Sequence, residues 1–186
     1  MRVITGSARG VKLKSPAGMQ TRPTADRVKE ALFSKIQFEL PGARVLDLFA
    51  GTGQLGIEAL SRGAAEAVFV DAQDSACALV RENLRLAKLE PQGRVIRADY
   101  LQYLKMCNTR FSIIFLDPPY AELFLENALK KISEIDILAN GGIIMTERPV
   151  GKELSLRLPG FQRSQDSKYG KTLLTLFRKE WSEETE

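Results

Sequence analysis

The stretch Arg44-Val-Leu-Asp-Leu-Phe-Ala-Gly-Thr-Gly-Gln-Leu-Gly56 determines how the rest of the chain is arranged. Its first six residues, 44–49, are almost continuously apolar, which predicts a strand that is buried on both faces. Three glycines in a G-x-G-x-x-G pattern follow, and glycine permits a tight turn and a close approach of the backbone to a ligand. A helix over 55–62 is expected next. A buried strand, a glycine turn and a helix in this order indicate the first unit of a parallel α/β sheet.

The chain continues with the same alternation of apolar strands and helical segments, which predicts a mainly parallel sheet covered on both faces. Its end is different. Two strand-like segments flank Tyr169-Gly170 with no helix between them, so they are expected to form an antiparallel hairpin. The prediction is a Rossmann-like, doubly wound α/β fold whose sheet has seven strands, at 44–49, 67–71, 94–97, 111–116, 142–147, 161–168 and 172–179, with helices at 55–62, 75–89, 100–106 and 122–134.

An N-terminal extension precedes this alternation. Short extended pieces at 2–5 and 11–14 predict a small β-hairpin, and Thr24 is expected to cap a helix that runs to about residue 39. The chain therefore divides into an N-terminal extension with its helix, residues 1–40, one main domain, residues 41–180, and a disordered acidic tail, residues 181–186.

The extension is also the basic part of the chain. Residues 1–44 hold nine Arg or Lys against three Asp or Glu, although the whole chain carries a net charge of only +4. A basic arm ahead of a nearly neutral domain is typical of contact with phosphates, and a solvated extension is the alternative interpretation. The side chains that we expect to bind RNA are Arg2, Arg9, Lys12, Lys14 and Arg27.

Several classes of protein are excluded or disfavoured by composition. The chain has no histidine, which excludes Ser-His and Cys-His nucleophile pairs. Its two cysteines, Cys77 and Cys107, match neither a zinc pattern nor a disulfide framework. No apolar run is long enough for a membrane span or a secretory signal. We therefore expect a cytoplasmic, metal-free protein without membrane association, and we expect it to be a monomer.

Acidic residues near the glycine turn predict the type of cofactor. Asp71 ends the second strand, twenty residues after Gly51, where a carboxylate can accept hydrogen bonds from ribose hydroxyls. To this point an NAD-dependent dehydrogenase fits equally well. Asp47 distinguishes a dinucleotide cofactor from a cationic one. A carboxylate inside the strand would repel a pyrophosphate and attract a cationic cofactor such as S-adenosylmethionine. Asp99 can accept from an adenine amino group, cap the helix at 100–106, or do both.

The segment Asp117-Pro-Pro-Tyr120 follows the fourth strand and is expected to lie beside the cofactor. Two prolines stiffen the loop and leave carbonyl acceptors in fixed directions, and the tyrosine ring can stack on a base. Acceptors on Asp117 and Pro118 could hold both hydrogens of an exocyclic amino group, so that its lone pair faces a methyl donor. Positioning of this kind needs no histidine. The four residues Asp117, Pro118, Pro119 and Tyr120 are the predicted catalytic set.

These motifs resemble those of class I methyltransferases that act on amino nitrogens. Arg22-Pro-Thr-Ala-Asp-Arg-Val-Lys-Glu-Ala-Leu-Phe33 narrows the resemblance to the bacterial RsmD family, as do Gly56-Ile-Glu-Ala-Leu-Ser-Arg-Gly63 and Tyr169-Gly170. The resemblance implies transfer of methyl from S-adenosylmethionine to the 2-amino group of guanine 966 in 16S ribosomal RNA, in an assembling or assembled small subunit. It makes 41–180 the methyltransferase domain. The expected cofactor-binding residues are Arg22, Thr24, Asp47, Phe49, Gly51, Gly53, Asp71, Ala72, Asp99 and Tyr100.

One position departs from the family pattern, and two other functions stay open. Family members usually carry a second acid two residues after the ribose-binding one, where this chain has Gln73, so we expect a change in cofactor affinity without loss of activity. The first alternative is methylation of adenine in DNA or RNA, or of a protein glutamine. Enzymes with these targets often have Asn at the position where this chain has Asp117. The second alternative is a non-catalytic RNA-binding assembly protein that keeps the fold.

Overall fold

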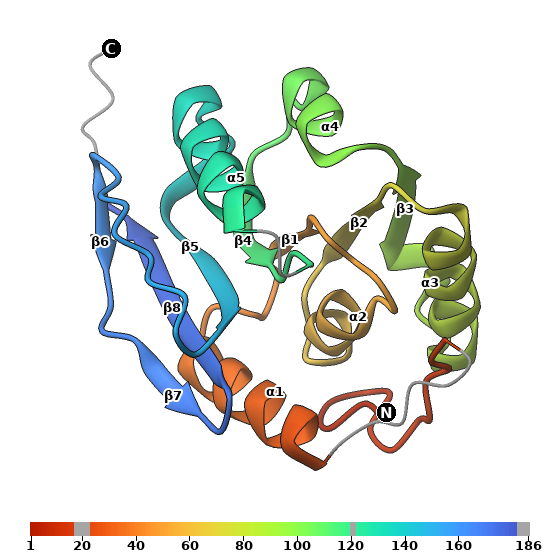
Figure 1. The fold of residues 1–186 in the computed structure, drawn as a ribbon. Coiled ribbons are helices and arrows are strands. Elements are labelled where there is room, and N and C mark those ends of the chain that lie inside the picture. The colour runs from red at the N-terminus through yellow and green to blue at the C-terminus, as the bar shows by residue number, and fades with distance from the viewer. Residues whose placement is uncertain (17–22, 120–121, 182–186) are drawn as a thin grey trace.

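The computed structural model describes residues 1–16, 23–119 and 122–181, with the backbone alone at 23–25 and 122–123. Its centre is one mixed sheet with the strand order β3-β2-β1-β4-β5-β8-β6, in which β7 also pairs with β8 (Figure 1). The strands are β1 (Arg44–Asp47), β2 (Glu66–Asp71), β3 (Gly93–Arg97), β4 (Phe111–Leu116), β5 (Leu138–Pro149), β6 (Phe161–Arg163), β7 (Ser167–Tyr169) and β8 (Thr172–Lys179). The helices are α1 (Pro23–Lys35), α2 (Gln54–Ser61), α3 (Asp74–Ala87), α4 (Tyr100–Met106) and α5 (Glu122–Ile135), with a short 3-10 turn, η1, at Glu90–Gln92.

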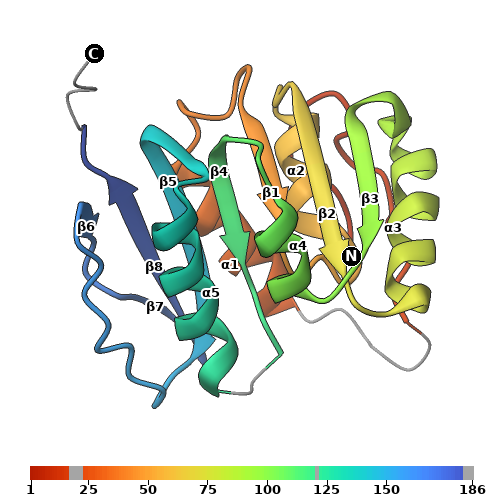
Figure 2. The same cartoon turned by 90° about the horizontal axis from the view of Figure 1, so that it is seen from above.

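The doubly wound fold and its reversal at the C-terminus are confirmed. Strands β1 to β5 pair in parallel, and β8 pairs antiparallel with β5. Figure 2 shows the parallel strands ending at one edge of the sheet while β8 runs the opposite way. The seventh position of the sheet is divided, because β6 and β7 pair with opposite ends of β8. The predicted strand at 161–168 is therefore interrupted between Arg163 and Ser167.

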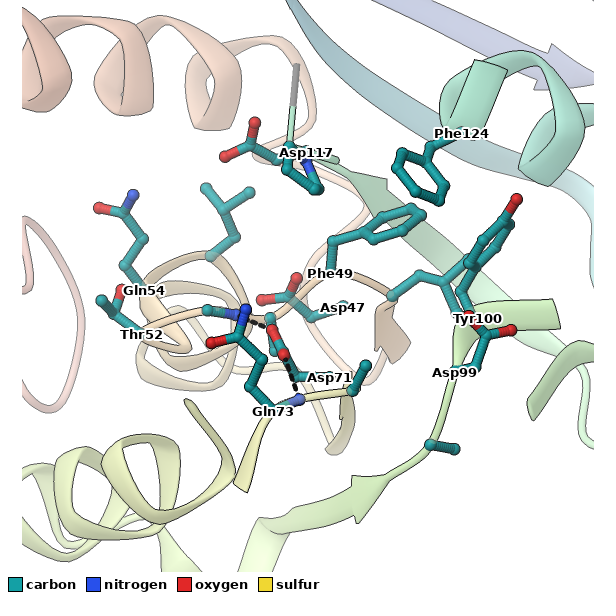
Figure 3. A pocket seen from close by; sticks show the side chains of 17 residues that line it. Asp47, Phe49, Thr52, Gln54, Asp71, Gln73, Asp99, Tyr100, Asp117 and Phe124 are labelled. Atoms are coloured by element: carbon teal, nitrogen blue, oxygen red, sulfur yellow. Dashed lines mark hydrogen bonds between the residues drawn. The ribbon is translucent and has the colours of Figure 1, made fainter. Parts of the chain in front are cut away.

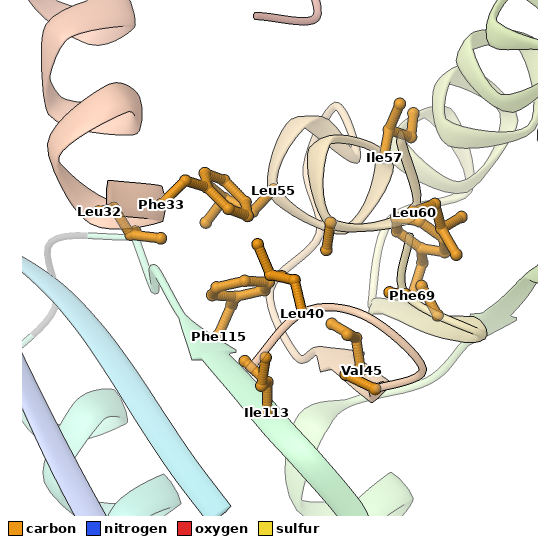
Figure 4. Packing of buried hydrophobic residues seen from close by; sticks show 14 of the residues in the cluster. Leu32, Phe33, Leu40, Val45, Leu55, Ile57, Leu60, Phe69, Ile113 and Phe115 are labelled. Atoms are coloured by element: carbon orange, nitrogen blue, oxygen red, sulfur yellow. The ribbon is translucent and has the colours of Figure 1, made fainter. Parts of the chain in front are cut away.

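Helices cover both faces of the sheet and bury two hydrophobic clusters. Figure 1 shows α1, α2 and α3 on one face and α4 and α5 on the other. Alternating residues of the same strand enter different clusters, as Val45 and Leu46 of β1 show. On the first face, Phe33 of α1 meets Phe115 of β4 with ring centroids 5.6 Å apart (Figure 4). The central strands β1, β2 and β4 are buried on both sides, which explains why they are largely apolar.

Among the element boundaries that differ from the sequence prediction, three concern α1 and β5. Helix α1 begins at Pro23, so Thr24 lies within its first turn and does not precede it as a cap. It ends at Lys35, before the predicted residue 39, because Glu39 N–H bonds to the Ile36 carbonyl in a tight turn. Strand β5 begins before residue 142, because Gly141 takes a left-handed φ of 71° and the ladder with β4 continues past an irregularity.

The predicted N-terminal hairpin is present: Arg2 and Lys12 form an antiparallel bridge, and Val3 N donates to the Val11 carbonyl at 3.0 Å. Longer-range contacts also hold this segment. The carboxylate of Glu58 on α2 accepts from Ile4 N and Thr5 N at 2.8 and 3.0 Å. Asn83 on α3 accepts from Lys14 N at 2.7 Å. The arm, residues 1–14, is thus a part of the folded domain that α2 and α3 hold in place. Of the helices in the described ranges, none is both long and apolar enough to cross a membrane.

Candidate active site

A cavity of about 530 Å³ opens at the edge of the sheet where the parallel strands end. Its wall is formed by the turns after β1, β2, β3 and β4 and by the start of α5 (Figure 3). The residues that line it are Asp47, Leu48, Phe49, Ala50, Gly51, Thr52, Gln54, Leu55, Asp71, Ala72, Gln73, Ala98, Asp99, Tyr100, Asp117, Pro119 and Phe124.

The glycine turn takes its shape from the glycines and from Asp71. Gly53 precedes α2 with a left-handed φ of 77°, a conformation that favours glycine. Gly56 lets α2 approach the sheet, because a Cβ atom there would lie 2.2 Å from the ring of Phe69. The two carboxylate oxygens of Asp71 accept from Gly51 N and Gln73 N, each at 2.9 Å. Asp71 therefore holds the first and second turns together at the cavity wall.

Asp47 is a buried carboxylate with few partners. Its side chain is 1% exposed and accepts one hydrogen bond, from Gly56 N at 3.1 Å, among the residues that the structure describes. Burial raises the pKa of Asp47 to about 7, the nearby charge of Asp71 adds to the rise, and the Gly56 bond opposes it. Burial and the charge of Asp71 disfavour the ionised form of Asp47, so a cationic ligand beside this carboxylate would stabilise it.

Asp99 combines a structural role with a place on the cavity wall. Its carboxylate caps α4 by accepting from Leu101 N and Gln102 N at 2.9 and 3.3 Å. The same residue lines the cavity. The cap is therefore present, and the side chain remains at a position where it can meet a ligand.

Three aromatic rings form one side of the cavity. Phe49 lies 5.1 Å from Tyr100 and 6.4 Å from Phe124, measured between ring centroids. Figure 3 shows these rings opposite Thr52 and Gln54. Phe124 was not predicted from the sequence. Its position near the start of the predicted helix at 122–134, shortly after the Asp117-Pro-Pro-Tyr120 segment, was the available signal.

Asp117 enters the site from the end of β4. It is half-buried, and its pKa is raised well above the usual range by burial, by the charge of Glu147 and by the charge of Asp47. Burial also raises the pKa of Glu147, against a hydrogen bond from the Thr172 side chain. Glu147 was not predicted from the sequence, although an acid at the end of an apolar strand carries the same signal as Asp47.

Most of the predicted cofactor residues meet at this cavity. Gly53 shapes the turn but does not line the cavity, and Pro118 is also absent from its wall. Arg22 and Tyr120 lie outside the described residues, as does the side chain of Thr24. The predicted residues that line the cavity are Asp47, Phe49, Gly51, Asp71, Ala72, Asp99, Tyr100, Asp117 and Pro119.

The predicted RNA-binding residues lie outside the cavity and are exposed. Arg2, Arg9, Lys12 and Lys14 lie on the arm, and Arg27 lies on α1. Lys14 is partly engaged, because its Nζ lies 3.0 Å from Glu82 Oε1. Within residues 1–16, 23–119 and 122–181, no group of three or more Cys, Asp or Glu side chains is arranged to hold a metal ion.

A doubly wound sheet with an antiparallel last strand, a glycine turn between two acidic strand ends and an Asp-Pro-Pro turn beside them define a class I methyltransferase. Residues 1–178 match the family described as Conserved hypothetical protein 95. The chain belongs to this family, which is the RsmD family that its motifs resemble.

Named relatives share nearly the whole chain. YlbH of Bacillus subtilis, a candidate rRNA methyltransferase, is 41% identical over 96% of this chain and 99% of its own. Ribosomal RNA small subunit methyltransferase D of Escherichia coli is 32% identical over 97% of this chain and 90% of its own. The solved structure of the Escherichia coli candidate methyltransferase YhhF has a TM-score of 0.87 at 32% identity, covering 97% of this chain and 98% of that one.

Proposed function

We propose that this protein transfers a methyl group from S-adenosylmethionine to the 2-amino group of guanine 966 in 16S ribosomal RNA. The observation that carries the proposal is that Asp117 shares one cavity with Asp47, Asp71 and Asp99. The relatives named for methylation of the small ribosomal subunit support the choice of RNA. We further propose that it acts in the cytoplasm as a monomer, on an assembling or assembled small subunit.

The cavity fits S-adenosylmethionine by size and by charge. Its volume lies within the range of roughly 300 to 1,000 Å³ that is usual for ligand pockets. When bound, the cofactor supplies a methyl group activated by a positive sulfonium. Asp47 offers a buried carboxylate to the cationic end, and Asp71 and Asp99 offer acceptors to ribose hydroxyls and to the adenine amino group. The cofactor-binding set is Asp47, Phe49, Gly51, Asp71, Ala72, Asp99 and Tyr100, with Gly53, Arg22 and Thr24 added from the family resemblance.

Gln73 is the chain's own variation at this site. Its side chain lines the cavity, and its backbone N–H holds Asp71 in position. A glutamine can hydrogen-bond to the adenosine without adding a negative charge. We therefore propose that Gln73 adjusts cofactor affinity and leaves the reaction intact.

The Asp-Pro-Pro-Tyr segment would hold the target base. Asp117 would accept a hydrogen bond from one N–H of the amino group, and the Pro118 carbonyl would accept one from the other N–H. These two hydrogen bonds would direct the nitrogen lone pair toward the methyl group. Tyr120 stacks on the base. In this arrangement, fixed acceptors act where positive charge develops on the nitrogen, so that rate comes from positioning and electrostatics. A target base within a duplex would first have to be flipped out.

The basic arm would bring the RNA to the cavity. Lys14 N and O both bond to Asn83, and Asn83 Nδ2 donates to the carbonyl of Thr52 at 2.8 Å. Because Thr52 lines the cavity, phosphates held by the arm would lie near the glycine turn. We propose residues 1–40 as the RNA-facing extension of a methyltransferase domain at 41–180, followed by an acidic tail at 181–186.

The test is methyl transfer from labelled S-adenosylmethionine to small subunits and to free 16S RNA, both prepared from cells that lack this enzyme. We expect one labelled nucleoside, 2-methylguanosine, at a single site. Methylated adenine would keep the cofactor assignment and remove the guanine assignment. No label on either RNA, together with no binding of S-adenosylmethionine, would refute the enzyme and favour an RNA-binding assembly protein.

A further inference from the structure

Glu147 lies beside Asp117 because of the strand register. Strands β4 and β5 are parallel, with Phe115 opposite Met145 and Leu116 opposite Thr146, so the next residues along the two strands, Asp117 and Glu147, are level. Phe115 and Met145 belong to the hydrophobic cluster under α1 and α2. Side chains alternate along a strand, so the two carboxylates, each two positions further on, point to that same face.

This pair of carboxylates is rich in acceptors and poor in donors. Glu147 receives a hydrogen bond from the Thr172 side chain, and no donor in the described part of the chain bonds to Asp117. The adjacent cation, Arg148, turns away to Asp166 and Thr175. Two half-buried carboxylates that no cation of the described residues pairs with favour a ligand edge that presents several N–H groups.

Guanine has such an edge and adenine does not. Guanine presents the ring N1–H next to both hydrogens of its 2-amino group, which makes three donors in a row. Adenine places the ring nitrogen N1, an acceptor, next to its amino group, and the lone pair of that acceptor would face a carboxylate. A site that must hydrogen-bond a group rejects an analogue that lacks it, because its own buried polar atoms are then unpaired.

Building on the proposed function, we propose that Glu147 selects guanine by accepting a hydrogen bond from N1–H while Asp117 holds the 2-amino group. The raised pKa of Asp117, which Glu147 helps to cause, agrees with their proximity. Glu147 is then a specificity-determining residue at the second position of an acceptor pair, and the antiparallel strand β8 supports it through Thr172.

The experiment compares two acceptors that share the 2-amino group and differ at N1 and at the substituent on C6. Small subunits are reconstituted with 16S RNA that carries either guanine or 2,6-diaminopurine at the target. The analogue keeps the 2-amino group but has an unprotonated N1. Single-turnover rates are measured for the wild type, for Glu147→Gln and for Glu153→Gln, which changes an exposed glutamate as a matched control. Binding of S-adenosylhomocysteine reports whether each variant is folded.

We expect the wild type and Glu153→Gln to prefer guanine by about 100-fold or more. Glu147→Gln should lower this ratio at least about tenfold, because its amide N–H can donate to the unprotonated N1. Equal wild-type rates on both acceptors, or an unchanged ratio in Glu147→Gln, would overturn the inference alone. If Glu147→Gln does not bind S-adenosylhomocysteine, the ratio of the wild-type rates on the guanine and 2,6-diaminopurine acceptors decides whether the inference stands. Failure of the wild type to methylate the guanine acceptor would overturn the proposed function, and the inference with it.

Discussion

Buried carboxylates occur at two places on the α1–α3 face of the sheet, and the protein treats them in opposite ways. Glu58 on α2 is fully buried, with Arg62 Nε 2.8 Å and Lys29 Nζ 3.5 Å from its oxygens and two backbone N–H groups bonded to it. Asp47 and Asp117 share one backbone donor between them, the N–H of Gly56, among the described residues. Around Glu58 the fold neutralises the charge completely, and at the cavity it leaves the charge for a ligand.

We propose that this contrast distinguishes acids that hold the fold together from acids that meet a ligand. Glu58 connects the arm, α1 and α2, and its partners satisfy it within the fold. A buried charge that lacks partners lowers stability, so its presence at a cavity points to a ligand that offsets the cost. The following changes test that division, from the largest expected effect to the smallest.

Glu58→Ala should cause the largest loss of stability. It would leave the ammonium of Lys29, only 2% exposed, without its carboxylate, which typically costs about 3–5 kcal/mol. For a domain of this size, this corresponds to a fall in Tm of about 10 °C or more. Glu66→Ala removes the exposed partner of Arg44 and is the control, with an expected cost of at most about 1 kcal/mol. Equal effects in thermal unfolding would contradict the contrast.

Asp117→Ala should affect the reaction and spare the fold. Loss of a fixed acceptor at the reacting group is expected to lower kcat by about 100- to 1,000-fold, with cofactor affinity and Tm nearly unchanged. Asp74→Ala, at an exposed carboxylate paired with Arg97, serves as the control and should keep wild-type kcat. A variant that unfolds or loses the cofactor, but whose remaining folded fraction reacts normally, would move Asp117 to the structural group.

Asp47→Asn should stabilise the protein without cofactor while weakening cofactor binding by about tenfold or more. Because the folded state raises the pKa of Asp47 to about 7, folding favours its protonated form. This contribution to stability is fully present below pH 4 and is lost as the pH rises to about 7, at up to about 1.4 kcal/mol per pH unit. The Asn variant should therefore gain most over the wild type at pH 8 and least at pH 4. Urea unfolding at several pH values measures this, and a constant difference would contradict it.

Lys12→Gln, on the arm that Glu58 holds, should have the smallest effect. If Lys12 contacts a phosphate, RNA affinity falls modestly and the slope of log K against log salt decreases by about one. Lys105→Gln on α4, on the opposite face of the sheet, should leave the slope unchanged. Filter binding at several salt concentrations distinguishes the two, and identical slopes would remove the arm from the RNA interface.

Local patterns in the sequence were sufficient to predict the sheet, its parallel direction and most of the cavity wall. Asp47, Asp71, Asp99 and Asp117 each lie at or just past the end of a parallel strand, and parallel strands bring such ends to one edge. Glu147 was missed because its proximity to Asp117 depends on the register between β4 and β5, which neither segment encodes alone. The partners of the arm were missed for the same reason, since Glu58 and Asn83 lie on helices that are distant in sequence.

The position of the arm's partners has a consequence for synthesis. Residues 1–14 leave the ribosome before α2 and α3, but Glu58 and Asn83 hold Thr5 and Lys14 from positions 53 and 69 residues further along. The arm can dock only after α2 and α3 have emerged, and until then its cations are free to contact other polyanions. Once docked, Asn83 also bonds to the carbonyl of Thr52 in the glycine turn. The nascent chain therefore completes the arm and the glycine turn in a single late step.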